Sequence, residues 1–291
     1  MSTDSLLKNR NFVFFLSIRW FYSVAIQSIT LTVGWQVYIL TGNPLDLGLI
    51  GLAQVFPIFL FILPSGVIAD KFDRKIVICL CTIVHLLVAV YLLYYSLSGP
   101  TSIWPILIAL LVHGTARAMY QPSLSAILPN IVEKKVFPNA TAYNSSVGKL
   151  GHLIGPLISG VIISFYDTKV YIFAIICFAI STISTLFLKN PKNPNNLKSV
   201  SLSVVISGFV YVWKTRLVLG TMSIDLFAVL FGGIMGMLPI FAIDILKIGP
   251  EGLGLLRTMP AVGGVLTGIL LTQLPPINNA GKNLLISMTI F

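Results

Sequence analysis

Five charged residues stand together between two long uncharged stretches, and this arrangement restricts what the chain can fold into more than any other feature. They lie between Asp70 and Lys75. Residues 47–69 before them and 76–101 after them contain no Asp, Glu, Lys or Arg. A helix needs about 20 apolar residues to cross the hydrocarbon core of a bilayer, and each stretch is long enough. The sequence therefore predicts two membrane-spanning helices joined by a very short loop.

Composition extends this prediction to the whole chain. Of 291 residues, 56% are hydrophobic and only 10% are charged, whereas soluble domains carry about 25% charged residues. The apolar stretches are too long for the strands of a membrane barrel, and backbone groups in lipid must find partners within their own segment. We therefore expect an all-α integral membrane protein that has the lipid bilayer as a partner.

Eight stretches have the length and apolarity of membrane spans, and a ninth begins near residue 283. The eight lie near residues 12–39, 47–69, 76–97, 102–126, 143–166, 170–188, 217–243 and 252–274. A polar segment rich in Asn and Pro follows the sixth span, and an apolar stretch after it resembles a helix in the membrane interface. These features predict a six-helix bundle at 1–188, a cytoplasmic linker with an interfacial helix at 189–216, and a partial C-terminal bundle at 217–291.

The net charge of +10 reflects orientation in the membrane. Basic residues between the predicted spans fall almost entirely on the side of the N-terminus, and only Lys169 and Lys247 fall on the other side. An excess of Lys and Arg marks the cytoplasmic side of a membrane protein, so we expect a cytoplasmic N-terminus. The charges do not form a stripe on one face, so no nucleic-acid partner is expected.

The short loop has a recognisable pattern, in which Gly66 and Ala69 precede Asp70 and the basic pair Arg74 and Lys75 follows. It resembles the signature loop of the major facilitator superfamily of transporters. The resemblance implies a conformational switch, in which Asp70 and the basic residues steady one state by contacts with neighbouring helices. The alternative is a solvated turn whose lysines only follow membrane topology.

The fifth span carries a helix-packing motif made of small residues and one proline: Gly148, Gly151, Gly155, Pro156 and Gly160. Glycines four residues apart let two helices approach closely, and a proline permits a bend. The motif resembles the glycine-proline motif in the fifth helix of facilitator exporters, which is associated with antiport. Ordinary helix packing explains it equally well.

The segment between the fourth and fifth spans supports the same relationship. Its residues 117–122, 126–129, 137–140 and 144–146 are spaced as in the exporter branch that contains the enterobactin exporter and the macrolide-efflux proteins. With the loop and the first span, the resemblance covers essentially the whole chain. It implies the major facilitator fold, with a complete first six-helix bundle and an incomplete second one, as in a truncated twelve-span protein. It also implies the bacterial cytoplasmic, or inner, membrane.

Two arginines inside predicted spans, Arg19 and Arg117, are candidates for a transport pathway. A charge in the middle of a span costs at least about 2.5–3.5 kcal/mol, so each should face a partner or an aqueous cavity. Arg19 is close enough to the end of its span to reach the interface instead. We place Gln27 and Gln121 in the same substrate and proton pathway, although Gln27 is equally suited to a hydrogen bond between helices.

Asp225 is the one acidic residue well inside a predicted span. A carrier driven by protons needs a titratable group that is exposed to each side in turn, so Asp225 is the candidate for proton coupling. The alternative is a structural ion pair with an arginine. Three histidines, His85, His113 and His152, lack the spacing of metal ligands, and no metal site is expected.

No phosphate-binding loop and no nucleophile with a neighbouring base is present, so we expect no enzyme activity and no cofactor. The hypothesis is a proton-coupled antiporter that exports small drug-like or siderophore-like molecules by alternating access. One alternative is an uptake permease of the same fold. Another is a truncated, non-transporting membrane remnant that inserts into the bilayer and moves nothing.

Overall fold

The computed structural model describes residues 6–189, 213–215, 218–223, 226 and 233–273. These residues form helices and short connections, and they contain no β-strand, which confirms the predicted all-α class. The chain divides into two compact units, Met1–Ser199 together with Gly236–Thr258, and Val200–Met235 together with Met259–Phe291. Most of the second unit, including Asp225 and the predicted ninth span, lies outside the described residues, as does most of the predicted linker.

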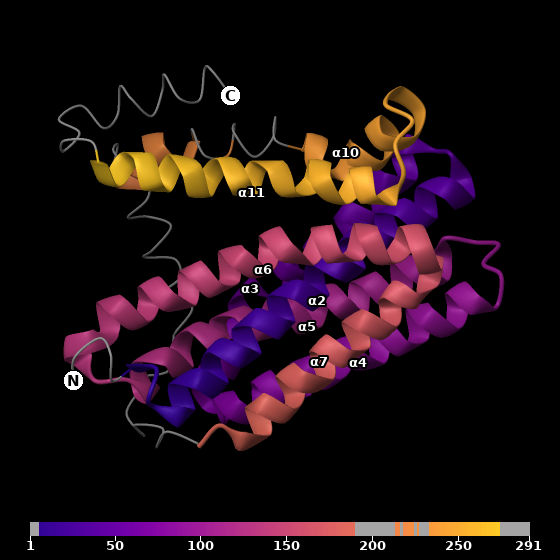
Figure 1. Cartoon of the computed structure of the whole chain (residues 1–291). Coiled ribbons are helices and arrows are strands. Elements are labelled where there is room, and N and C mark those ends of the chain that lie inside the picture. The colour runs from indigo at the N-terminus through magenta and orange to yellow at the C-terminus, as the bar shows by residue number, and fades with distance from the viewer. Residues whose placement is uncertain (1–5, 190–212, 216–217, 224–225, 227–232, 274–291) are drawn as a thin grey trace. The chain divides into compact units, whose positions relative to one another are not determined.

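Six long helices make up most of the first unit (Figure 1). They are α2 (Arg10–Thr41), α3 (Pro44–Lys71), α4 (Arg74–Leu97), α5 (Trp104–Ile131), α6 (Phe137–Tyr166) and α7 (Val170–Phe187). Each corresponds to one of the first six predicted spans. The ends agree within about three residues except that α5 ends later and α6 begins earlier than predicted. Hydropathy marks where a span leaves the lipid, whereas the backbone hydrogen bonds of a helix continue into water.

Among the described residues, four stretches are long and apolar enough to cross a membrane. They are Arg10–Thr41, Pro44–Phe61, Arg74–Leu97 and Lys134–Phe187, the last of which contains two helices. Helix α5 is not among these stretches, and it carries His113, Arg117 and Gln121 in its middle. Polar residues in the middle of a span point to a protein interior or a cavity, not to lipid.

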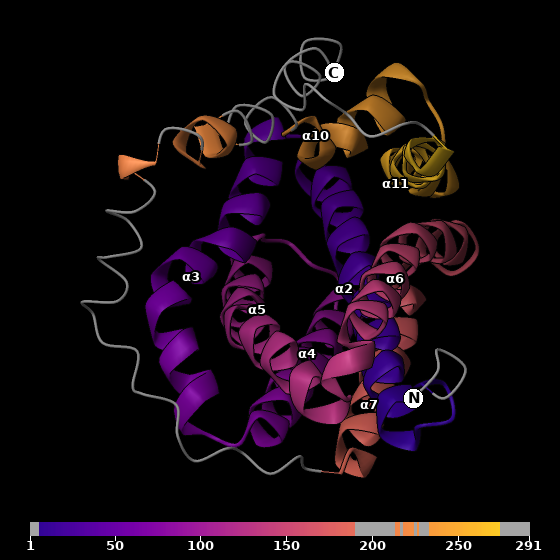
Figure 2. The same cartoon turned by 90° about the vertical axis from the view of Figure 1, so that its left-hand side faces the viewer.

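The six helices pack in a continuous order (Figure 2). Helix α2 contacts α6 and α7, helix α5 contacts α3 and α4, and α4 contacts α7 to join the two groups. Helix α2 contributes more buried residues than its neighbours, among them Phe12, Ile18 and Ile29. Because a helix buried on most sides loses contact with lipid, α2 and α5 form the inner part of the bundle.

The connection between α3 and α4 is shorter than predicted, because it consists of Phe72 and Asp73 alone. The Asp73 carboxylate accepts a hydrogen bond from the Lys75 backbone amide at 2.9 Å and so caps α4. Arg74 Nη1 donates to the Ala126 carbonyl of α5 at 2.9 Å, and Lys75 Nζ donates to the Leu186 carbonyl of α7 at 2.8 Å. The basic residues of this loop therefore join the ends of three helices.

The segment Gly236–Thr258 packs within the first unit. It includes most of α10 (Ile234–Ile240), a π-helical turn η3 (Phe241–Ile245) and the first part of α11 (Pro250–Gln273). The Tyr38 hydroxyl of α2 donates to the Asp244 carboxylate, and Thr258 Oγ1 donates to the Leu153 carbonyl of α6 at 3.2 Å. The start of α11 therefore lies against α6.

Candidate functional site

Polar side chains of three helices make contacts between α2, α5 and α6, and two of them, Gln121 and His152, are exposed. Arg19 Nη1 of α2 donates to Gln121 Oε1 of α5 at 3.3 Å, and Arg117 lies one helical turn before Gln121. Gln27 Nε2 of α2 lies 2.7 Å from His152 Nδ1 of α6. We refer to Arg19, Gln27, Arg117, Gln121 and His152 as the polar cluster.

Gly148 makes room for the guanidinium of Arg19. A Cβ atom at position 148 would lie 2.8 Å from both Nε and Nη2 of Arg19, which is closer than side-chain atoms approach each other. The Arg19 guanidinium of α2 thus occupies the space that a side chain at position 148 of α6 would fill. The spacing of the motif predicts a helix-packing role for Gly148, but its neighbour in the structure is a charged group.

The next two glycines of the motif bring α6 directly onto α2. A Cβ at Gly151 would lie 2.6 Å from Ser23 Cβ, and one at Gly155 would lie 2.9 Å from Gln27 Cβ and 3.0 Å from the Val24 carbonyl oxygen. Close approach of two helix backbones through small residues is typical of membrane bundles. These contacts hold Gln27 and His152 within hydrogen-bonding distance.

The last residues of the motif contact α11 in place of α2. A Cβ at Gly160 would lie 2.6 Å from the Pro250 carbonyl oxygen, and one at Gly254 would lie 2.6 Å from the Pro156 carbonyl oxygen. Pro156 has no amide proton to donate to a helix hydrogen bond. Gly160 and Gly254 are small enough to let the backbones of α6 and α11 touch. Helix α6 therefore has one glycine surface for α2 and another for α11.

The positive charge of the polar cluster has no negative partner among the described side chains. Neither Arg19 nor Arg117 forms an ion pair with a described carboxylate, and Arg19 Nε is buried without a described hydrogen-bond acceptor. The described carboxylates belong to residues at or near helix ends: Asp46, Asp73, Glu133, Asp167, Asp244 and Glu251. Among the described residues, the polar cluster is therefore electropositive.

A second polar group lies behind the cluster and is fully buried. Tyr22 Oη of α2 lies 3.2 Å from His85 Nε2 of α4, and His85 Nδ1 lies 2.9 Å from His113 Nδ1 of α5. Two facing Nδ1 atoms make one hydrogen bond only if one ring carries the proton there and the other does not. The Tyr120 ring stacks on Tyr22 at 3.6 Å between centroids.

The hydrogen-bond inventory favours one direction for this chain of groups. If Tyr22 donates to His85 Nε2, then His85 Nδ1–H donates to His113 Nδ1 and only the His113 Nε2–H is left over. In the reverse direction, the Tyr22 hydroxyl proton and the His113 Nε2 lone pair are both left over. His113 Nε2 is buried without a partner among the described atoms in both arrangements. The first arrangement is favoured because it also gives the Tyr22 hydroxyl proton an acceptor.

The remaining predicted site residues fall into two groups. Arg74 and Lys75 bind helix-end carbonyls, and a Cβ at Gly66 would meet no described atom within 4 Å. Asp225 and the side chains of Ala69 and Asp70 lie outside the described part of the chain. Of the five pathway residues that the sequence suggests, the structure places Arg19 against Gln121 and Gln27 against His152, and Arg117 lies one turn from Gln121 on α5. No spacing rule could have found His152, because 125 residues separate it from Gln27.

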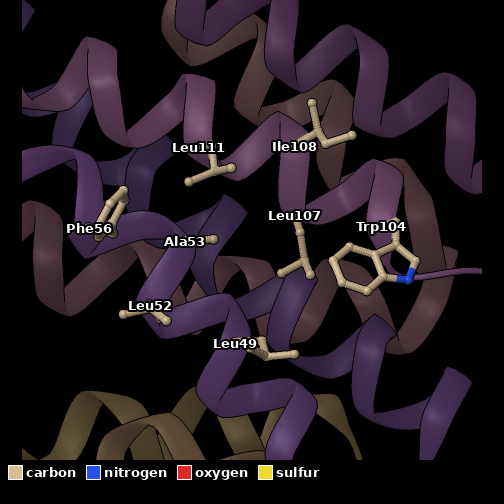
Figure 3. A pocket seen from close by; sticks show the side chains of 8 residues that line it. All are labelled: Leu49, Leu52, Ala53, Phe56, Trp104, Leu107, Ile108 and Leu111. Carbon is tan, nitrogen blue, oxygen red and sulfur yellow. The ribbon is translucent and has the colours of Figure 1, made fainter.

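A separate groove on the bundle is entirely apolar (Figure 3). It has a volume of about 350 Å³ and lies between α3 and α5, lined by Leu49, Leu52, Ala53, Phe56, Trp104, Leu107, Ile108 and Leu111. Gln54 follows Ala53 but is buried and accepts a hydrogen bond from Thr30 of α2 at 3.3 Å. Helix α3 thus presents an apolar face to the groove and a polar side chain to α2.

The architecture matches a solved membrane transporter of the major facilitator type. The match is to a bacterial homologue of the human lysosomal transporter Spinster, in an inward-facing and unoccupied conformation, with a TM-score of 0.65 and 17% identity. It covers 93% of this chain and 65% of the other. The match shows that the two chains share a fold. The chain belongs to the transmembrane secretion effector family of the major facilitator superfamily, whose model matches residues 11–291. This family consists of transporters and not of enzymes, as the sequence predicts.

The chain is similar to two curated proteins that are named as transporters or efflux proteins. The staphyloferrin A transporter of Staphylococcus aureus is 28% identical over 82% of this chain and 61% of its own length. Macrolide efflux protein A of Streptococcus pyogenes is 20% identical over 86% of this chain and 63% of its own length. The chain thus spans about three fifths of the length of these relatives. The second relative agrees with the predicted macrolide-efflux branch.

Proposed function

We propose that the protein is a secondary transporter that exports a small drug-like or siderophore-like molecule across a bacterial cytoplasmic membrane in exchange for protons. Family membership supports transport, and the relatives include one named for efflux and one named for a siderophore. The observation that carries the proposal is the polar cluster, because three helices of a membrane bundle bring charged and amide groups together on a partly exposed surface of the described bundle. Groups of this kind in a membrane interior mark a pathway for a polar ligand.

In this proposal the first bundle moves as one body during alternating access, with its N-terminus in the cytoplasm. Arg74 and Lys75 join α4 to the ends of α5 and α7, so these helices keep their relative positions. The Asp70 loop steadies one of the two states. Asp225 carries the proton, because a carboxyl group in a span can bind a proton on one side of the membrane and release it on the other.

Inverted membrane vesicles from cells that express the natural gene test both export and coupling. Radiolabelled siderophore or macrolide should accumulate when an inside-acid proton gradient is imposed, and a protonophore should abolish the accumulation. Asp225→Asn should abolish it as well, because an amide cannot carry the proton, while Asp225→Glu should retain it. Unchanged gradient-driven accumulation by Asp225→Asn would rule this residue out as the proton carrier.

The same vesicles separate the proposal from its alternatives. An uptake permease would concentrate the label in right-side-out vesicles and not in inverted ones. A non-transporting remnant would give no difference in either orientation between membranes with the protein and membranes from cells that lack the gene.

A further inference from the structure

The charge inventory of the polar cluster points to the chemistry of its ligand. Arg19 and Arg117 come from facing helices, and the groups around them are neutral: Gln27, Gln121 and His152. None of the carboxylates that the structure describes is paired with either arginine. Two cations that are neutralised by no described group make a site that attracts anions and repels cations.

We propose that the polar cluster binds a substrate bearing carboxylate groups, held between Arg19 and Arg117. This inference rests on the proposed export function and adds to it the chemical class of the exported molecule. A carboxylate is the ligand that a guanidinium fits best, because its two oxygens match the parallel N–H groups of the planar fork. Two arginines on facing helices suit a molecule with two such groups.

The surroundings of Arg19 hold its partly exposed side chain in place. Its Nε atom is buried and has no described acceptor, while Nη1 already donates to Gln121 at 3.3 Å. Gly148 leaves the guanidinium no room to move toward α6, because Nε and Nη2 lie at 2.8 Å from where a Cβ would be. The guanidinium is thus positioned before any ligand arrives, which lowers the entropy lost on binding.

The rival explanation is that Asp225, outside the described residues, neutralises the arginines as a structural ion pair. The two explanations make opposite predictions for the ligand-free protein. If Asp225 is the partner, removing an arginine charge leaves a buried carboxylate alone and lowers the melting temperature. If the partner is a ligand, removing the charge does not lower the melting temperature of the ligand-free protein.

The test measures the melting temperature of the purified protein in lipid nanodiscs. Succinate serves as the probe, and its uncharged diester, dimethyl succinate, serves as the control. A ligand that binds the folded state raises its melting temperature with concentration. Succinate should raise the melting temperature of the wild-type protein, and dimethyl succinate should not change it. Arg19→Gln and Arg117→Gln should each weaken the apparent affinity by about tenfold or more, since each loses a hydrogen bond to a charged group.

Two variants make the result specific to the cluster. Arg19→Lys keeps the charge and should retain part of the succinate effect, which Arg19→Gln does not. Lys149→Gln removes a positive charge from the exposed residue next to Gly148 and should leave the effect intact, which separates site binding from a general salt effect.

Three outcomes would overturn the inference: an equal effect of dimethyl succinate, a succinate effect that survives both glutamine variants, or a lower melting temperature of both variants without succinate. Failure of the proposed export function looks different. In that case the succinate effect persists in nanodiscs while the vesicles show no gradient-driven transport of any label.

Discussion

Two arginines of the same bundle have contrasting surroundings. Arg74 is 8% exposed and donates to the Ala126 carbonyl of α5. Arg19 is partly exposed, donates to the neutral side chain of Gln121 and keeps a buried Nε without a described acceptor. A hydrogen bond from a charged group to a backbone carbonyl stabilises the fold. A cation whose one described acceptor is a neutral side chain contributes less stability and is available to a ligand.

The largest effect is expected from filling the space that Arg19 occupies. Gly148→Leu places a side chain where the guanidinium lies, because even a Cβ there would be 2.8 Å from Nε. We expect substrate affinity to fall by about 10- to 100-fold, equivalent to one charge-assisted hydrogen bond. The free energy of unfolding should also fall by about 1–3 kcal/mol through overpacking. Radioligand binding and denaturant unfolding measure the two effects.

A matched control is Gly48→Leu, because a Cβ at Gly48 of α3 would meet no described atom within 4 Å. This variant should keep wild-type binding and stability. If both glycine variants lose binding equally, the loss comes from adding a bulky side chain and not from displacing Arg19.

The second prediction is that one substitution has different consequences at the two arginines. Arg74→Gln should lower the free energy of unfolding by about 1.5–3 kcal/mol, because the Ala126 carbonyl loses a charged donor. Arg19→Gln should leave it unchanged or raise it, because an unpaired charge is removed from the membrane interior. Circular dichroism during denaturant titration measures both values. Equal losses at the two positions would mean that Arg19 stabilises the fold as much as Arg74 does.

The smallest effect is expected at Lys75. Its Nζ donates to the Leu186 carbonyl from an exposed position at the end of α7. Lys75→Gln should therefore cost about 0.3–1 kcal/mol of unfolding free energy, the usual contribution of a cation at a helix C-terminus. The loss should shrink in high salt, whereas that of the more buried Arg74 should persist. A salt-independent loss at Lys75 would show that its contact is not mainly electrostatic.

Hydropathy was sufficient to predict the helices of the first bundle, because a membrane span must be continuously apolar. It could not give the ends of α5 and α6, which extend beyond the apolar stretches to Ile131 and back to Phe137. The charged loop was recognised from its pattern, but its two-residue length depends on the Asp73 cap.

The site was only partly accessible from the sequence. Arg19, Gln27, Arg117 and Gln121 stand out as polar residues within apolar spans, and the structure brings them together. His152 and the His85–His113 pair do not stand out, because their partners lie on other helices and no local spacing encodes the contact. Gly148 has the spacing of a packing residue, and only the position of Arg19 shows which group it accommodates.

The two-residue connection between α3 and α4 also sets how the chain yields to mechanical force. Two extended residues reach about 7 Å, so pulling α3 out of a bilayer loads α4 almost at once. The contacts from Arg74 to Ala126 and from Lys75 to Leu186 pass that load to α5 and α7. Under tension this end of the bundle therefore resists as one unit. We expect α3 to leave the membrane together with α4 as a helical hairpin.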